Sequence, residues 1–168
     1  SSQTRCVTCP KGKGNSGKSA SCGECVAGKR KDVSTQECFE CEVGTFQTEP
    51  GQVLCEQCPV GFSQSDTGQA TCVQCSPGEF NDVAGATTCK TCVNSTYFGG
   101  KERNSSCIDC PMGWSSEDGS AKCTVCGAGT YGVGCELCNV GKYRTSDMNA
   151  TECEQCPSGF SQSDEGQA

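Results

Sequence analysis

Turn-forming residues divide this chain into short stretches of three to five residues, in which hydrophobic and polar residues are mixed. Pro and Gly recur around each stretch, for example Pro59 and Gly61 before one stretch and Gly68 after it. Turn-forming residues at this spacing allow only very short strands joined by turns. The pattern therefore predicts one small irregular β-hairpin per stretch and little or no helix.

The cysteines recur with the same period as these stretches. All 20 belong to C-x-x-C pairs, and successive pairs lie 16 to 18 residues apart except for a step of 12 from Cys123 to Cys135. We call the segment from one pair to the next a rung. A fixed period of this kind indicates a repeat architecture in which each unit packs against its neighbours. The pairs are 6/9, 22/25, 38/41, 55/58, 72/75, 89/92, 107/110, 123/126, 135/138 and 153/156.

The residues after each pair have two forms, which differ in the place of an aromatic residue. One form reads C-P-x-G-(F/W)-S, as at 58–63, and the other reads C-x-x-G-x-(F/Y), as at 41–46. We expect the ring to cover the neighbouring disulfide as a miniature core. The order of the forms predicts triplet repeats at 6–54, 55–106 and 107–152, and a truncated start of a fourth repeat at 153–168. That fourth copy stops two residues before the next expected cysteine, so we expect the sequence to be a piece of a longer chain.

Composition explains why cysteine must hold the fold together. Leu, Ile, Val and Phe number only 21 of 168 residues, a level at which an unconstrained chain is expected to stay disordered. A disulfide that closes a loop of ~15 residues stabilises the fold by about 3 kcal/mol, because it lowers the entropy of the unfolded chain. Such cysteine density is stable where thiols stay oxidised, which indicates a secreted or cell-surface protein.

Two disulfide pairings are compatible with the spacing. In a ladder, the second cysteine of each pair bonds the first cysteine of the next pair, which leaves Cys6 and Cys156 to pair outside the sequence. Crossed pairing in blocks of four, such as 6–22 with 9–25, would satisfy all cysteines internally. We favour the ladder because it makes every rung equivalent. Its bonds are Cys9–Cys22, Cys25–Cys38, Cys41–Cys55, Cys58–Cys72, Cys75–Cys89, Cys92–Cys107, Cys110–Cys123, Cys126–Cys135 and Cys138–Cys153.

Metal-binding and catalytic interpretations of the cysteines have less support. Five tetrathiolate zinc sites could be drawn from successive pairs, but each would add two negative charges to a chain of net charge −7. A thioredoxin-like pair needs one activated thiol at a helix N-terminus, whereas ten similar pairs lie between predicted turns. The chain has no His, which excludes the Ser-His and Cys-His nucleophile systems. We therefore expect no enzyme, no cofactor and no metal site.

Three N-x-S/T sequons are consistent with an extracellular glycoprotein, namely Asn94, Asn104 and Asn149. The net negative charge and the lack of any Lys/Arg cluster beyond 29–31 argue against nucleic acid or an anionic membrane as the partner. No apolar run of 18 residues occurs, so we expect no membrane span in this segment. Covalent N-glycans are the expected modification.

The string C-x-x-C-P-x-G-(F/Y/W)-S, followed by G-x-x-x-C, resembles the cysteine-rich repeats of the ephrin-receptor type. These repeats are similar in appearance to EGF-like modules and to the loops of tumour-necrosis-factor receptors. The resemblance is clearest at residues 55–92 and 107–126. It implies a disulfide-rich extracellular array, and it leaves the function open, because such repeats occur in receptors, matrix proteins and surface or filament proteins.

Two functional classes follow. In the first, an elongated array of stacked rungs forms a rod that serves as a stalk, coat or filament subunit, with copies of itself as the expected partner. In the second, the array is the ligand-binding ectodomain of a receptor or adhesin. The second class predicts an exposed apolar or aromatic patch that breaks the repeat, for which 97–98 and Trp114 are the candidates.

Overall fold

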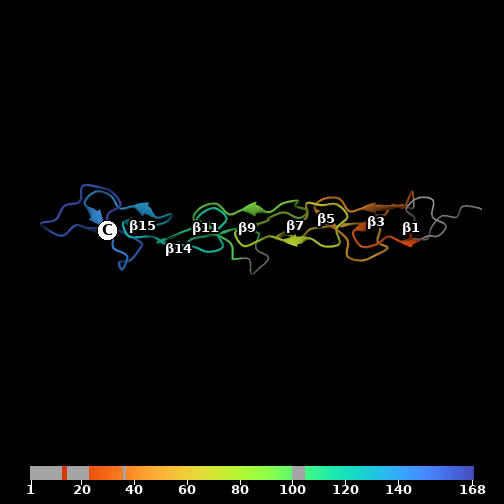
Figure 1. The fold of residues 1–168 in the computed structure, drawn as a ribbon, viewed down its shortest axis with the longest axis horizontal. Coiled ribbons are helices and arrows are strands. Elements are labelled where there is room, and N and C mark those ends of the chain that lie inside the picture. The colour runs from red at the N-terminus through yellow and green to blue at the C-terminus, as the bar shows by residue number, and fades with distance from the viewer. Residues whose placement is uncertain (1–12, 15–22, 36, 100–104) are drawn as a thin grey trace, which may run out of the picture. The chain divides into compact units, whose positions relative to one another are not determined.

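All regular structure among the residues that the structure describes is β-strand of two or three residues. The computed structural model describes residues 13–14, 23–35, 37–99 and 105–168. None of these residues forms a helix, so the described part of the chain contains no helix able to cross a membrane. The strands pair only as two-stranded antiparallel hairpins, and no hairpin joins a larger sheet (Figure 1).

The chain forms two compact units. The first contains Ser1–Cys75 and Asn81–Cys89, and the second contains Ser76–Phe80 and Lys90–Ala168. The hairpins described in the first unit are β1 (Lys13–Gly14) with β2 (Gly23–Glu24), β3 (Lys29–Lys31) with β4 (Cys38–Glu40), β5 (Thr45–Phe46) with β6 (Glu56–Gln57), and β7 (Phe62–Ser63) with β8 (Val73–Gln74).

The second unit continues the same series. Its described hairpins are β9 (Glu79–Phe80) with β10 (Lys90–Thr91), β11 (Thr96–Tyr97) with β12 (Ile108–Asp109), β13 (Trp114–Ser115) with β14 (Thr124–Val125), β15 (Thr130–Tyr131) with β16 (Glu136–Leu137), and β17 (Lys142–Tyr143) with β18 (Glu154–Gln155). The predicted class, a disulfide-rich array of hairpin rungs with little or no helix, is confirmed for the described residues.

The described rungs open with a tight turn, and in all but one of them a glycine makes this turn possible. We count positions from the second cysteine of a pair, so Gly61 is the third position of the rung that begins at Cys58. The Phe62 N–H donates to the Pro59 carbonyl at 3.0 Å and closes the turn, and Gly61 has φ +83°. Glycine populates this left-handed region without the penalty that a Cβ atom imposes. The turn then leads directly into the first strand of the hairpin.

Successive rungs are joined by the same backbone hydrogen bonds. The third-position N–H donates to the sixth-position carbonyl of the next rung at 2.7–3.0 Å, and the third-position carbonyl accepts from the next second cysteine. These contacts satisfy polar backbone groups that burial would otherwise leave unpaired. The donor and acceptor pairs are Gly28–Gln47, Gly44–Gln64 and Gly61–Asn81 in the first unit, and Gly78–Phe98, Ser95–Ser116, Gly113–Gly132, Gly129–Arg144 and Gly141–Gln162 in the second.

The third-position glycine is also constrained by the rung two places further on. A Cβ atom added to Gly44 would lie 2.1 Å from the Gly85 carbonyl oxygen, and one added to Gly78 would lie 1.9 Å from that of Gly119. Both distances are shorter than any non-bonded contact between these atoms. In both cases the rung packs against the second rung after it, and this close backbone approach admits only glycine at Gly44 and Gly78.

Burial within a rung repeats at the second cysteine, the third position and the sixth position. Cys41 and Cys58 are fully buried, and each is followed by a buried glycine and a buried sixth-position residue. The expected aromatic core is wrong: the rings at positions four and five are half-buried or exposed, as Trp114 shows at 41 % exposure. Among the described aromatic residues only Phe98 is buried, and it occupies a sixth position. The hairpin directs its own side chains outward, while sulfur and backbone fill the centre.

Replacing Gly78 with Ala is expected to destabilise the second unit by at least about 2 kcal/mol more than the same change at Gly141, because the added Cβ must displace the Gly119 backbone. Gly141 is the matched control, since it is also a third position with φ +79° but has nothing within 4 Å of an added Cβ. Urea unfolding with disulfides intact measures the difference. Equal losses of unfolding free energy in the two variants would show that glycine is required for the left-handed backbone and not for close packing.

Candidate functional site

The disulfides form a sequential ladder throughout the described residues. Eight bonds join the second cysteine of one pair to the first cysteine of the next, and Cys25 bonds Cys38 and not Cys9 as crossed pairing requires. The loops span 13 to 15 residues except that of Cys126–Cys135, which spans 9. Bonds with Cys6, Cys9 or Cys22 lie outside the described residues. Cys156 is a half-buried thiol without a disulfide partner among the residues described.

These bonds also bear on the zinc alternative. Cysteines in disulfides carry no thiolate, so those of the eight bonds cannot form the tetrathiolate sites drawn from the spacing. In the described part of the chain, no three His, Cys, Asp or Glu side chains gather into a group that could hold a metal ion. The chemistry available at the cysteines is therefore thiol–disulfide exchange.

The sixth position carries a buried polar side chain in most rungs, and this side chain ties its own loop together. The Gln64 Nε2 donates to the Thr71 carbonyl at 2.8 Å, and its Oε1 accepts from the Asp66 N–H at 3.0 Å. The Gln47 amide makes the corresponding pair of contacts with Leu54 and Glu49. Because each amide is satisfied by donors and acceptors of the loop backbone, its burial stabilises one loop conformation.

In other rungs the sixth-position side chain reaches back to the preceding hairpin. The Asn81 Nδ2 donates to the Phe62 carbonyl at 2.7 Å, and the Ser116 Oγ donates to the Thr96 carbonyl at 2.6 Å. Both acceptors belong to the fourth position of the previous rung. The two sequence motifs end one residue before the sixth position, so the buried sixth-position side chains were not predicted from the sequence. A polar residue at this place in eight rungs was the available signal, at Asn15, Lys31, Gln47, Gln64, Asn81, Ser116, Arg144 and Gln162.

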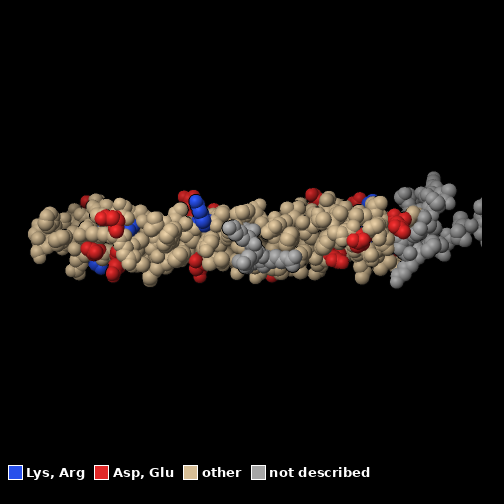
Figure 2. Space-filling model, turned by 90° about the horizontal axis from the view of Figure 1, so that it is seen from below, with Lys and Arg blue, Asp and Glu red and all other residues tan. Residues whose placement is uncertain are grey.

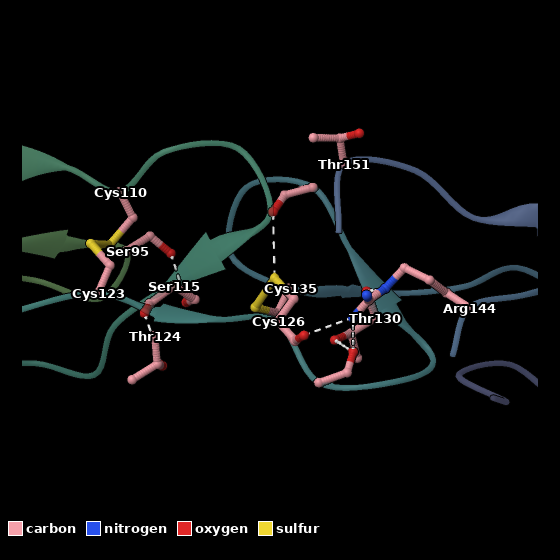
Figure 3. Close-up of a disulfide and its surroundings, with 12 residues drawn as sticks. Ser95, Cys110, Ser115, Cys123, Thr124, Cys126, Thr130, Cys135, Arg144 and Thr151 are labelled. Atoms are coloured by element: carbon pink, nitrogen blue, oxygen red, sulfur yellow. Dashed lines mark hydrogen bonds between the residues drawn. A yellow bond between two sulfur atoms is a disulfide. The ribbon is translucent and has the colours of Figure 1, made fainter. Parts of the chain in front are cut away.

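Arg144 is the sixth-position residue that follows the contracted rung, and it is 1 % exposed. Its Nη2 donates to the Cys126 carbonyl at 2.7 Å and to the Gly127 carbonyl, and its Nε donates to the Thr130 carbonyl. Figure 3 shows the side chain extending from its own rung to Thr130, close to the Cys126–Cys135 disulfide. At several other junctions the carbonyl of the second cysteine accepts a hydrogen bond from a glycine N–H of the next rung, as the Cys41 carbonyl does from the Gly68 N–H at 2.8 Å. The guanidinium therefore replaces a backbone donor.

The contraction also explains the one non-glycine third position that the structure describes. Ser95 has φ +60° and is half-buried, and the rung two places further on is the contracted one. The tenth-position carbonyl that blocks a Cβ elsewhere is absent there. The Ser95 Oγ instead lies 3.3 Å from the Ser115 Oγ, a contact drawn in Figure 3. A side chain is tolerated because the loop that would exclude it has been shortened.

The described sequons lie on exposed backbone. Asn94 is exposed within the turn after Cys92, and its N–H donates to the Asp118 Oδ1 at 2.7 Å. Asn149 is exposed, and its Oδ1 accepts from the Thr151 N–H at 3.1 Å. Asn104 lies outside the described residues. Both described asparagines thus have the exposure that a bulky glycan requires.

Charged side chains are dispersed and lie at the surface, apart from the buried Arg144 and Lys31. Figure 2 shows acidic groups scattered over the face in view without forming one patch. Hydrogen bonds from Ser34 and Thr35 lower the pKa of Asp32 to about 2, and the Thr145 hydroxyl lowers the pKa of Asp147. Both shifts arise from local turns, which stabilise the charged carboxylate.

Two neighbouring hairpins of the second unit expose apolar pairs. Trp114 pairs across β13 and β14 with Val125, which is 57 % exposed, and Tyr97 pairs across β11 and β12 with Ile108. We call these four residues the apolar pairs. The equivalent of Trp114 in the first unit, Phe62, pairs with the polar Gln74. Residues 97–98 were further candidates from the sequence for an exposed patch, in addition to Trp114. Tyr97 is half-buried and Phe98 is buried.

Hairpin rungs, sequential disulfides and a core of sulfur and backbone define a class of cysteine-rich repeat that is typical of extracellular and cell-surface domains. Residues 28–68 and 61–101 each match the family described as tyrosine-protein kinase ephrin type A/B receptor-like. Residues 28–101 therefore carry the cysteine-rich repeat of that family. Of the two segments in which the sequence resemblance is clearest, the matches include 55–92 but not 107–126. Both matches begin at a third-position glycine, and the ends of the first, Gly28 and Gly68, are in direct contact. No curated protein matches the chain.

Replacing Arg144 with Ala is expected to lower the free energy of unfolding of the second unit by about 2–4 kcal/mol, because several buried carbonyls lose a charged donor. Lys142→Ala is the matched control, since Lys142 is half-exposed in the same strand region. Thermal unfolding under oxidising conditions measures both variants. A loss at position 144 no larger than that at position 142 would contradict the capping role.

Proposed function

We propose that this chain is a structural repeat region of a secreted or cell-surface glycoprotein, in which stacked rungs form a rod that serves as a stalk, coat or filament subunit. The role is non-enzymatic. Copies of the same protein are the proposed partner, and N-glycans at Asn94, Asn104 and Asn149 are the proposed covalent additions.

The observation that carries the proposal is the repeated use of the same polar groups at most of the described junctions. The third-position N–H and carbonyl, the carbonyl of the second cysteine and the sixth-position side chain all bond within the array. Groups of this kind would line a binding site in an enzyme, but here they join one rung to the next. Repeat proteins whose units contact only near neighbours extend by adding units, which suits a spacer or fibre.

The extracellular part of the proposal is supported by two independent features. The eight described disulfides require an oxidising compartment to form and persist, and residues 28–101 carry a repeat of an extracellular receptor family. The acidic, dispersed surface charge favours solubility there.

A second function, ligand binding by a receptor or adhesin ectodomain, is favoured by the apolar pairs. Trp114 and Val125 break the polar pattern of the equivalent hairpin in the first unit, and Ile108 is 44 % exposed beside them along the chain. Aromatic residues exposed on a rigid scaffold are frequent anchors for protein ligands.

Glycosylation is tested on the chain secreted from a eukaryotic host. We expect the intact mass to exceed the sequence mass by whole N-glycans, which peptide N-glycosidase removes with conversion of the modified Asn to Asp. Asn149→Gln should remove one glycan, and Thr151→Ser, which preserves the sequon, should keep it. An unmodified mass for the secreted wild type would contradict the glycoprotein part of the proposal.

Assembly is tested by sedimentation and electron microscopy of the same secreted protein. We expect the chain to associate into filaments or sheets as its concentration rises, and we expect Trp114→Ala to leave that association intact. A monomer at all concentrations that binds one saturable protein ligand, and loses it in Trp114→Ala, would favour the ectodomain instead. Thr124→Ala is the matched surface control in the same hairpin.

A further inference from the structure

The contracted rung differs from the others in its backbone as well as its length. Cys126 and Cys135 are 9 residues apart, and the chain turns between them through Gly132 and Gly134, which have φ +71° and +79°. Cys135 itself has φ +57°, the only described cysteine in the left-handed region. A cysteine pays the Cβ penalty in this region, and the disulfide holds it there.

Opening this disulfide would release that backbone constraint. The freed Cys135 could return to the ordinary right-handed or extended region. None of the cysteines in the other seven described bonds has a positive φ that opening could relieve. A residue that relaxes when a bond opens shifts the equilibrium toward the open form. A Cβ added to Gly132 would meet nothing within 4 Å, so there is open space on one side of the turn into which the backbone can shift once the bond is open.

The contracted rung stays attached to its neighbours without the disulfide. The Cys126 N–H donates to the Gly113 carbonyl at 2.8 Å, and the Cys138 N–H donates to the Gly129 carbonyl at 2.8 Å. Arg144 also bridges the next rung to the carbonyls of Cys126 and Thr130. None of these contacts involves sulfur, so the array around the open bond remains connected.

We propose that Cys126–Cys135 is a redox-sensitive joint, which an external dithiol opens before any other disulfide that the structure describes. A thiolate of the dithiol attacks one sulfur of the bond and forms a mixed disulfide. Its second thiol then closes the reductant's own disulfide, so two electrons and two protons pass to Cys126 and Cys135. Sulfur–sulfur bonds are exchanged, and no other oxidant or reductant is required.

Opening the bond frees the turn that ties three successive rungs together. The Gly132 carbonyl accepts from the Gly113 N–H at 3.0 Å, and the Gly132 N–H donates to the Ala150 carbonyl at 2.9 Å. Both bonds depend on the turn that the disulfide closes. The reduced protein therefore gains motion within the second unit at this rung, while Arg144 keeps the rung in place for reoxidation.

The test is a redox titration of the folded full chain in mixtures of reduced and oxidised dithiothreitol. Free thiols are alkylated at each ratio, and the labelled peptides are quantified by mass spectrometry after full reduction with a second label. We expect Cys126 and Cys135 to be half-reduced at a reductant ratio about tenfold lower than the next described pair. Another described pair opening at the same or a lower ratio, or all pairs opening together, would overturn the proposal.

A loop exchange separates the backbone cause from other causes. Replacing residues 127–134 by residues 59–71 gives the rung the ordinary span of Cys58–Cys72. We expect the reductant ratio at which Cys126–Cys135 is half-reduced, its midpoint, to rise into the range of the other pairs. The same segment in place of residues 111–122 is the matched control and should leave the midpoint of Cys110–Cys123 unchanged. A midpoint that stays low after the first exchange would overturn the role of the contraction.

Reversibility tests the part played by Arg144. After the dithiol is removed, the wild type should recover the Cys126–Cys135 bond, and Arg144→Gln should recover it at least several-fold less completely, with mispaired products instead. Equal recovery in the two proteins would overturn the role of Arg144 in the joint. The wild-type titration stands independently of whether the variants fold.

Discussion

The close approach of a third-position glycine to the backbone two rungs further on is the constraint on which the rest of this structure depends. At Gly78 the opposing carbonyl occupies the volume in which a Cβ atom would lie. The same residue forms the left-handed turn that starts its hairpin, and its N–H and carbonyl bond to the next rung. A missing side chain thus allows packing, turn geometry and backbone pairing at one position. Ser95 keeps the turn and the pairing at a junction where the close approach is absent.

A core of this type needs few hydrophobic residues because it is made of sulfur and satisfied backbone. The second cysteine of each pair lies at the centre, and the sixth-position side chain closes the loop around it. The disulfides reduce the entropy of the unfolded chain, so a small apolar contribution suffices for a stable fold. This explains why large apolar side chains such as Val73 and Leu54 are exposed without cost to the core.

The sequence predicted the hairpins and the disulfide connectivity well because both depend on spacing. Equal loops between cysteine pairs make sequential pairing geometrically equivalent in each rung, and Cys58–Cys72 and Cys75–Cys89 have the same separation. The aromatic core was predicted wrongly because burial was inferred from residue type. Phe62 stands at the first position of its two-residue strand and Phe80 at the second, and both remain half-buried, because strands this short cannot enclose a ring.

The buried sixth position could not be recognised from residue type, because polar side chains are usually exposed. Gln64 and Asn81 are buried only because loop carbonyls and N–H groups surround them, and that arrangement exists only after the rungs stack. The signal was their common distance from the second cysteine.

The contracted rung is a set of coupled compensations within an otherwise regular array. Shortening the loop removes a carbonyl, which allows Ser95 at a place otherwise reserved for glycine. Arg144 takes over the capping of the Cys126 carbonyl, for which a glycine N–H serves at other junctions, and its longer reach bridges the gap. Its charge requires several carbonyl acceptors, and those of Gly127 and Thr130 serve beside that of Cys126. Lengthening this rung alone would therefore place a carbonyl against the Ser95 side chain, so the short loop and the serine depend on each other.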